Sequence, residues 1–220
     1  MRQMIIAVAL GGLGLAAPMP AGAQGGAAAG CDALLRAPGT GGWAEFRLER
    51  AGVQDMHVRF AIVGTERRGE RSLVWFETRA EGLQQGGVQI TQVLVPAYPY
   101  IPGQIEDFVA KRDSQPAVRL GAAPLARART QKSKLLAAVA DGCRGATLVG
   151  EEKITVPAGT FQTRHYRDAA GTTDIWIDPS RPFGVVRMIS RPDRSQLELR
   201  AAGTDARSSI TEKPAIYTGG

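Results

Sequence analysis

The amino-acid sequence predicts a mainly β (α+β) protein in which a strongly curved antiparallel sheet, or an incomplete barrel, is covered by one or more helices. Short runs rich in Val, Ile, Thr, Phe, Tyr and Trp recur along the 220 residues, which is the composition of strands. Loops of about two to six residues separate these runs, and such short connections favour antiparallel neighbours. A closed barrel or a two-sheet sandwich would give the same periodicity and stays open at this point.

The first 23 residues have the pattern of a secretory signal peptide. Arg2 precedes an apolar run from Met4 to Ala17, and small residues follow it as far as Ala23. The run is too short to span a membrane stably, and it ends in a typical cleavage pattern. We therefore expect cleavage after Ala23 and a mature protein in the periplasm or outside the cell.

Composition divides the rest of the chain into three parts. Residues 24–41 are rich in Ala, Gly and Pro and are expected to form a tether. Residues 42–204 carry the strand patterns and suffice for one hydrophobic core, so we expect a single domain there. Residues 205–220 return to small and polar side chains and are expected to be disordered.

The chain has two cysteines, Cys31 and Cys143. In an oxidising compartment two cysteines most simply form one disulfide, which is the pairing we expect. The alternative is a lipid anchor, because residues 28–31 end like the processing site of a bacterial lipoprotein. A leucine is missing three residues before Cys31, and the apolar run ends well upstream, which argues against the anchor.

The first half of the domain contains alternating patterns. Apolar and polar residues alternate over 44–49 and 56–62, which indicates a half-buried hairpin. Residues 73–76 are apolar on both faces, which suits a central strand, and 88–95 form the next strand.

A proline-rich stretch, 96–103, then excludes both a helix and a sheet ladder. Short strands are expected at 105–111 and 117–120, although the first also suits a helical turn. The helix is predicted near 133–141, where Ser133 provides an N-cap and a run of helix-forming residues ends at Gly142.

The stretch from Gly150 to Ile189 predicts a four-strand antiparallel meander. Residues 156–159 contain Pro and Gly, which stop a strand, and 168–171 and 178–182 have the same turn character. Residues 196–200 add a last alternating strand.

Candidate catalytic residues are few. His57 and His165 lie on predicted strands, where surface or packing roles are usual, and the sequence lacks the common nucleophile, phosphate-binding and dinucleotide-binding motifs. Glu151-Glu152 and the pair Asp174 and Asp178 flank strand ends, where solvated carboxylates are ordinary. Two distant cysteines without a nearby histidine lack metal-ligand spacing. We expect no enzyme activity, no metal and no cofactor.

The formal charge of +6 rests on 27 basic residues, mostly arginine, and gives no nucleic-acid signature. No basic run is interleaved with stacking aromatic residues, so we expect no nucleic-acid partner. Weak contact with anionic lipid at a membrane surface remains a secondary expectation.

Large apolar residues on the predicted strands are the candidates for ligand binding. A curved sheet would bring them into an apolar concavity, although an ordinary core is the equal alternative. Tyr98 and Tyr100, in the proline-rich loop, form either an exposed apolar tip or a loop folded back on the domain. The full candidate set is Phe60, Trp75, Tyr98, Tyr100, Tyr166, Trp176 and Met188.

Three segments resemble the second half of the LolA/LolB-like proteins, a group of periplasmic lipoprotein carriers and exported domains of unknown function. The segments are KITVPAGTFQT (153–163), DIWIDP (174–179) and GVVR (184–187). The resemblance implies an incomplete barrel whose concave face is covered by short helices and holds acyl chains. It transfers no binding residue, because the carriers' cargo-contacting positions have no match in this chain.

We therefore expect an exported, non-enzymatic binding protein that holds a lipid, a lipoprotein acyl chain or another apolar ligand. The alternative is a structural or protein-interaction module of a cell-envelope assembly, with an envelope protein as its partner.

Overall fold

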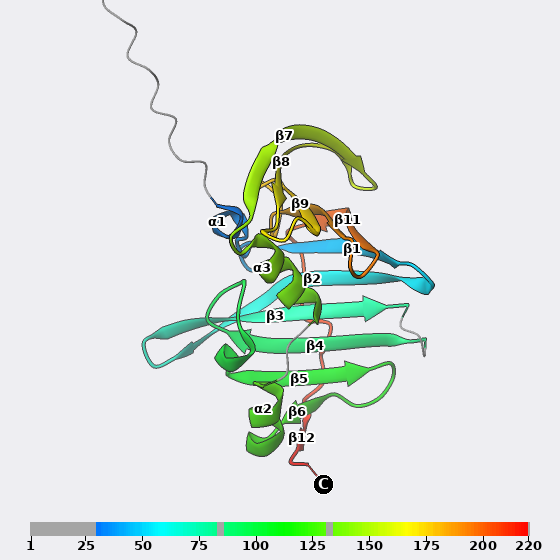
Figure 1. Ribbon diagram of the computed structural model, residues 1–220. Coiled ribbons are helices and arrows are strands. Elements are labelled where there is room, and N and C mark those ends of the chain that lie inside the picture. The colour runs from blue at the N-terminus through cyan, green and yellow to red at the C-terminus, as the bar shows by residue number, and fades with distance from the viewer. Residues whose placement is uncertain (1–29, 83–85, 131–133, 220) are drawn as a thin grey trace, which may run out of the picture.

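A computed structural model describes residues 30–82, 86–130 and 134–219, except for the side chains of 134–138 (Figure 1). The predicted signal peptide and its cleavage site after Ala23 lie outside the described residues. Within them the chain forms a single twelve-stranded sheet in the order β12-β6-β5-β4-β3-β2-β1-β11-β10-β9-β8-β7. The strands are β1 (Trp43–Arg50), β2 (Val53–Arg68), β3 (Arg71–Glu81), β4 (Val88–Val95), β5 (Asp107–Arg112), β6 (Val118–Leu120), β7 (Thr147–Val156), β8 (Gly159–Arg167), β9 (Thr173–Ile177), β10 (Val185–Ser190), β11 (Ser195–Gly203) and β12 (Ala215–Tyr217).

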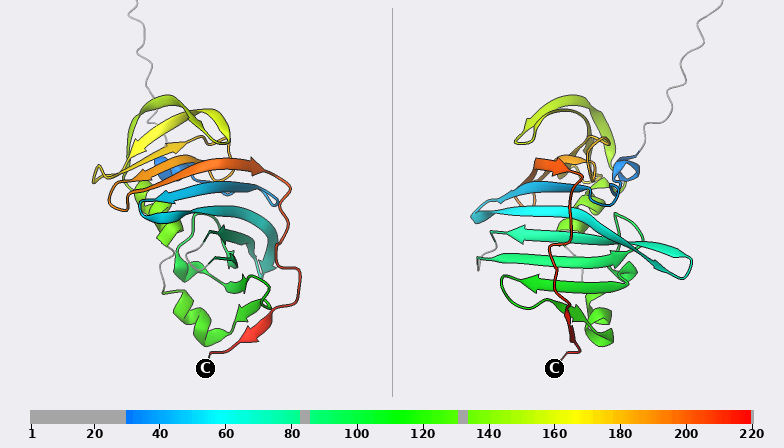
Figure 2. Two further views of the ribbon diagram at one scale, coloured as in Figure 1. Left: turned by 90° about the vertical axis from the view of Figure 1, so that its right-hand side faces the viewer. Right: turned by 180° about the vertical axis from the view of Figure 1, so that it is seen from behind.

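The sheet is curved and open, with β12 and β7 as its two edges (Figures 1 and 2). Every neighbouring pair is antiparallel except β12 and β6, which run parallel. The predicted fold class, a curved antiparallel sheet with a few helices, is therefore confirmed, and the closed barrel is excluded. Of the segment expected to be a strand at 105–111, residues 107–111 lie in β5 rather than in a helical turn.

Two meanders make up the sheet, β1 to β6 and β7 to β11, and they join at its centre. There β1 lies beside β11, so that Trp43 is opposite Gly203 and Leu48 is opposite Leu197. The three turns predicted within residues 150–189 all fall between strands. The tightest is at 156–159, where Gly159 has a φ of 128°, a backbone conformation that favours glycine.

In the described part of the chain, three short helices and one 3-10 turn accompany the sheet: α1 (Cys31–Leu34), α2 (Ala122–Ala128), α3 (Lys134–Cys143) and η1 (Pro102–Gln104). The helix predicted at 133–141 is confirmed as α3. It continues through Gly142, which the sequence pattern places just beyond the end. A Cβ atom at Gly142 would lie 2.9 Å from Cδ1 of Ile175, so the missing side chain lets the helix approach β9.

The predicted disulfide between Cys31 and Cys143 is present and links α1 to the end of α3. Both cysteines are buried, as are Leu34 and Leu35. The part of the predicted tether that is described, residues 30–41, is thus attached to the domain. The sulfur that a lipid anchor would need is bonded to Cys143.

The two faces of the sheet are covered by different parts of the chain. The helix face carries α1 and α3, and most of the buried apolar side chains form one cluster on that side. A C-terminal segment crosses the opposite face, as Figure 2 shows from behind. A second, smaller cluster of Ile90, Val109, Ala117 and Ile210 lies beneath it.

This segment, residues 205–217, is here called the strap, and it corrects the expectation of a disordered tail. Its residues Ala206 and Ile210 are buried, and its polar side chains bond to successive strands of the sheet. Its last residues form β12, which pairs with β6. Small and polar composition suggested disorder because it did not reveal these distant partners. The bonds run from Trp43 to Asp205 (2.7 Å), Ser209 to Glu77 (2.6 Å), Gln92 to Ser208 (2.7 Å) and Lys111 to Glu212 (2.6 Å).

The β7–β8 hairpin bends so that its tip reaches back to the middle of the sheet (Figure 1). The Ala158 amide donates to the carbonyl of Leu199 on β11 at 3.1 Å. The Arg187 guanidinium on β10 donates to the carbonyl of Thr155 at 2.9 Å. The hairpin therefore covers the side of β10 and β11 that bears Arg187 and Glu198.

Candidate functional site

An aromatic cluster lies at the centre of the helix face. Phe60 on β2 contacts Phe46 on β1 and Phe76 on β3, with ring centroids 5.6 Å apart in both pairs. Phe183, from the loop between β9 and β10, packs its ring against Phe60 and Phe76. Phe46, Phe60 and Phe76 share one face because side chains alternate along adjacent strands, and Phe183 reaches the same cluster from its loop; all four are buried.

Tyr98 and Tyr100 fold back onto this cluster rather than forming an exposed tip. Tyr98 stacks on Phe76 at 5.6 Å and is buried, and Tyr100 meets Phe76 edge to face at 5.7 Å. Burial raises the pKa of both phenols. The neighbouring Ile101 is the exposed large apolar residue of this loop, with 61% of its surface accessible.

Two other predicted site residues, Tyr166 and Met188, are buried on the same face further along the sheet. Tyr166 lies opposite Ile175, which in turn lies opposite Met188, so the three form one row across β8, β9 and β10. Tyr166 is 1% exposed and Met188 is 3% exposed. In this part of the helix face the ordinary core, the alternative to a ligand cavity, describes the packing.

The two candidate tryptophans lie on the other face. Trp75 immediately precedes Phe76 on β3, so its side chain lies on the strap side of the sheet. There it packs against the smaller cluster, and its indole N–H donates to the Glu66 carboxylate at 3.2 Å. Trp176 stands between Ile175 and Ile177 and stacks on His165, with ring centroids 4.4 Å apart. The seven predicted residues therefore do not form one site.

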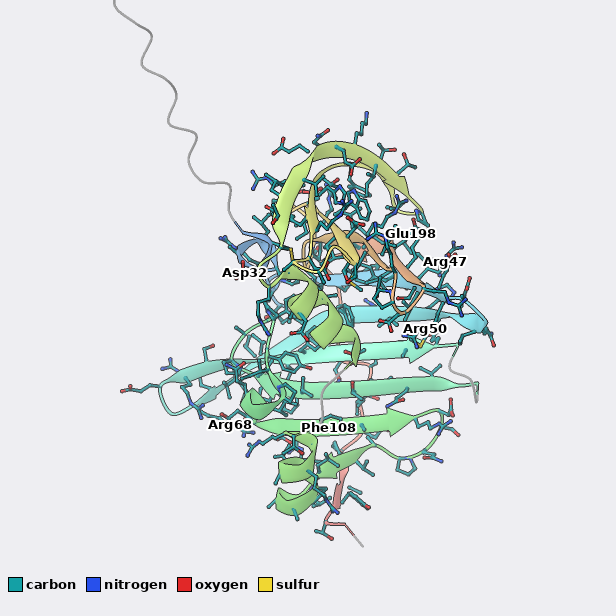
Figure 3. The ribbon with its side chains drawn as sticks, viewed as in Figure 1. Asp32, Arg47, Arg50, Arg68, Phe108 and Glu198 are labelled. Carbon is teal, nitrogen blue, oxygen red and sulfur yellow. A yellow bond between two sulfur atoms is a disulfide. The ribbon has the colours of Figure 1, made fainter. Side chains whose placement is uncertain are left out.

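Burial on the helix face is incomplete over β3, β4 and β5, and this is the candidate ligand site. Thr78 lies opposite Thr91, and Thr91 lies opposite Ala110. These small side chains are partly exposed, whereas the row beside them contains the larger Phe76, Val93 and Phe108. Figure 3 labels Phe108 on β5.

Sequence reasoning did not select these residues. Threonine and alanine on a strand have no distinctive signature, and their partial exposure depends on what covers the sheet above them. A row of small residues beside a row of large ones could have indicated open space only if the register were known.

A charged cluster around Asp174 is the most concentrated arrangement of titratable groups. The Asp174 side chain is only 4% exposed and accepts from Arg167 (2.7 Å), His165 (2.8 Å) and Arg191 (2.5 Å). Burial by itself would raise the pKa of Asp174, but the three hydrogen bonds outweigh it, and the pKa lies below its usual value.

His165 connects this cluster to its neighbours. Its Nδ1 lies 3.1 Å from Oε1 of Glu152, and the same carboxylate accepts a short hydrogen bond from the Trp176 indole. The cluster continues along one register row, in which His165, Trp176, Arg187, Glu198, Arg47 and His57 lie opposite one another on successive strands.

The buried carboxylates in the described part of the chain have bonding partners suited to a structural role. Glu198 pairs with Arg187 at 2.7 Å, and Asp107 pairs with Arg68 at 3.2 Å. Glu77 is 3% exposed and accepts hydrogen bonds from Gln92 and from both the amide and hydroxyl of Ser209. In the same residues no group of three or more His, Cys, Asp and Glu side chains is arranged to hold a metal ion.

The described helices are all too short or too polar to cross a membrane.

Comparison with known proteins gives little further information. No protein-family model matches the chain, and no curated protein matches it.

Two solved structures are similar to this chain. One is a candidate exported protein with a YmcC-like fold from Bacteroides fragilis, 9% identical, with a TM-score of 0.36. The other is a candidate lipoprotein from Parabacteroides distasonis, 11% identical, also with a TM-score of 0.36. Each comparison covers 77% of this chain and 98% of the other. These values are too low to assign a family, and the LolA/LolB-like relationship stays a prediction.

Proposed function

We propose that the protein is exported and holds an apolar ligand, such as a lipid or a lipoprotein acyl chain, on the helix face of β3 to β5. The observation that supports this is the partly exposed row of Thr78, Thr91 and Ala110 beside the larger apolar side chains of Phe76 and Phe108. Small side chains project less far from the sheet than the neighbouring aromatic rings, and their apolar surroundings suit an acyl chain.

Export is supported by the signal-peptide pattern and by the disulfide between Cys31 and Cys143. Binding without catalysis is supported by the state of the buried carboxylates, because those of Asp107, Asp174 and Glu198 pair with arginine. A general acid or base needs a carboxyl group that can exchange its proton with a substrate.

The energy of such binding needs few polar contacts. Burying acyl methylene groups contributes about 0.8 kcal/mol each, so roughly ten of them contribute about 8 kcal/mol before the entropic cost of association. Specificity would then come from the length of the exposed row and from the aromatic cluster at its end.

The test is to purify the exported protein and identify co-purifying lipids by native mass spectrometry, then to titrate it with a fluorescent naphthylamine dye that palmitate displaces. The variant Thr91→Trp places an indole on the proposed floor and should weaken dye binding at least tenfold. Thr65→Trp, at an exposed position of β2, is the matched control and should bind like the wild type. If no lipid co-purifies and palmitate displaces no bound dye, the proposal is excluded.

A further inference from the structure

A second site is suggested by a pocket of about 490 Å³ on the strap side of the sheet, near its centre. It lies on the opposite face from the proposed apolar site and is independent of it. Four adjacent strands, β11, β1, β2 and β3, supply its lining. The lining residues are Glu45, His57, Arg59, Arg79, Glu81 and Arg200.

Arg59 is the unusual member of this pocket. Its guanidinium lies over the ring of Trp43, with Cζ 4.3 Å from the ring centroid, and this stacking fixes the plane of the group. Its Nε atom is buried and has no hydrogen-bond partner. Within residues 30–82, 86–130 and 134–219 Arg59 also forms no ion pair, and the nearby carboxylate of Asp205 instead accepts from the Trp43 indole.

The register adds a second indication. Arg59 on β2 lies directly opposite Arg79 on β3, and like charges in that position repel each other. Arg79 is paired with Glu81 at 2.8 Å, and Arg200 is paired with Glu45 at 3.2 Å. Among the lining residues, Arg59 is therefore the arginine without a paired carboxylate in the pocket. Its charge still acts on the neighbouring Asp205, whose pKa is lowered first by the hydrogen bond from Trp43 and also by the charge of Arg59.

His57 contributes a further donor. Its Nδ1 lies 2.6 Å from the Arg200 guanidinium, which can only donate, so Nδ1 is the acceptor. A neutral imidazole with an accepting Nδ1 carries its proton on Nε2. Because His57 lines the pocket, this arrangement gives the pocket an imidazole N–H as well as guanidinium N–H groups.

We propose that this pocket binds the oxyanion of a small soluble carboxylate or phosphate, with Arg59 as its principal partner. A planar guanidinium matches the two oxygens of either group, and a buried donor without a partner is costly until an acceptor fills it. Glu45 and Glu81 flank the site and would repel the extended negative surface of a membrane, which favours a small solute.

The test follows the Nε–H resonance of Arg59 by NMR while phosphate or acetate is added at constant ionic strength, with chloride as the reference salt. The resonance should shift and saturate with phosphate or acetate but stay in place with chloride. In Arg59→Gln the affinity, followed through the Trp43 indole resonance, should fall at least tenfold. Arg67→Gln, an exposed arginine on the same strand, should bind like the wild type.

Failure of the wild-type Arg59 resonance to move with either oxyanion would overturn the proposal, even if Arg59→Gln did not fold. A further arm adds vesicles of phosphatidylglycerol or phosphatidylcholine. Arg59-dependent binding to the anionic vesicles, without any response to soluble anions, would assign the oxyanion to a lipid headgroup and refute the small-solute proposal.

Discussion

Phe183 and Tyr98 meet edge to face, with ring centroids 5.0 Å apart and an angle of 77° between the ring planes. Tyr98 follows β4 in the first meander, and Phe183 precedes β10 in the second. Their contact therefore links the two halves of the sheet across the helix face. Phe183 also has a φ of 63°, in the left-handed region that residues other than glycine seldom occupy.

Replacing Phe183 by alanine should reduce the free energy of unfolding by about 3–5 kcal/mol, because its fully buried ring contacts three other aromatic rings. Urea denaturation measures the change. Phe161→Ala removes a ring that is only partly buried and serves as the control. Equal losses in the two variants would contradict the central role of Phe183.

The lowered pKa of Asp174 predicts a pH-dependent contribution to stability. The stabilisation is complete above the unfolded pKa of about 4, and it is lost as the pH falls through the still lower folded pKa. Asp174→Asn should therefore be less stable than the wild type by about 1–3 kcal/mol at neutral pH. The expected loss is no larger because Arg167 and Arg191 are about half exposed, and solvent screens their attraction to the carboxylate.

The difference between wild type and Asp174→Asn should begin to narrow below about pH 4, where the carboxylate of the unfolded chain takes up a proton, and should vanish once the pH has fallen through the lower folded pKa. Chemical denaturation at a series of pH values measures this convergence. Asp55→Asn, at an exposed position, should show little difference at any pH. A gap for Asp174→Asn that is constant across the acid range would refute the assignment.

The disulfide predicts a redox-dependent stability. Removing it by the double change Cys31→Ser and Cys143→Ser should cost about 2–5 kcal/mol, since it closes a loop with a sequence separation of 112. Reducing agent should destabilise the wild type to a similar degree and leave the double variant unaffected. Sensitivity of the double variant to reductant would show that the effect arises elsewhere.

The strap predicts that a single hydroxyl contributes measurably to stability. Ser209→Ala removes one of the donors to the buried carboxylate of Glu77 and should lower stability by about 1–3 kcal/mol. Hydrogen exchange at β12 should also accelerate, because the strap holds that strand to the sheet. Ser72→Ala, at an exposed position of β3, is the control for loss of a hydroxyl.

Local features were predictable from the sequence, and features that depend on distant pairing were not. The turns at 156–159, 168–171 and 178–182 were recognised because Pro, Gly and Asp act on their own backbone. The bond between Ser209 and Glu77 joins residues separated by 132 positions, so composition alone could not reveal it.

The candidate site shows the same limit. Tyr98 and Tyr100 were selected because their proline-rich loop has no ladder to join, but their inward orientation depends on Phe76 and Phe183. Trp75 and Phe76 are adjacent, and alternation sends one to each face. Which of the two faces carries the helices is decided by the disulfide and by the packing of α3 on β9, neither of which has a local signature.

The pairing of β1 with β11 has a consequence for how the protein is made. Each meander can pair its own strands as soon as they leave the ribosome, but the centre of the sheet cannot form until Gly203 is available to meet Trp43. Until then the unpaired edge of β1 is open to other chains, at a stage when the protein is most exposed to aggregation. The strand pair that joins the two meanders of the finished sheet is thus among the last to be assembled.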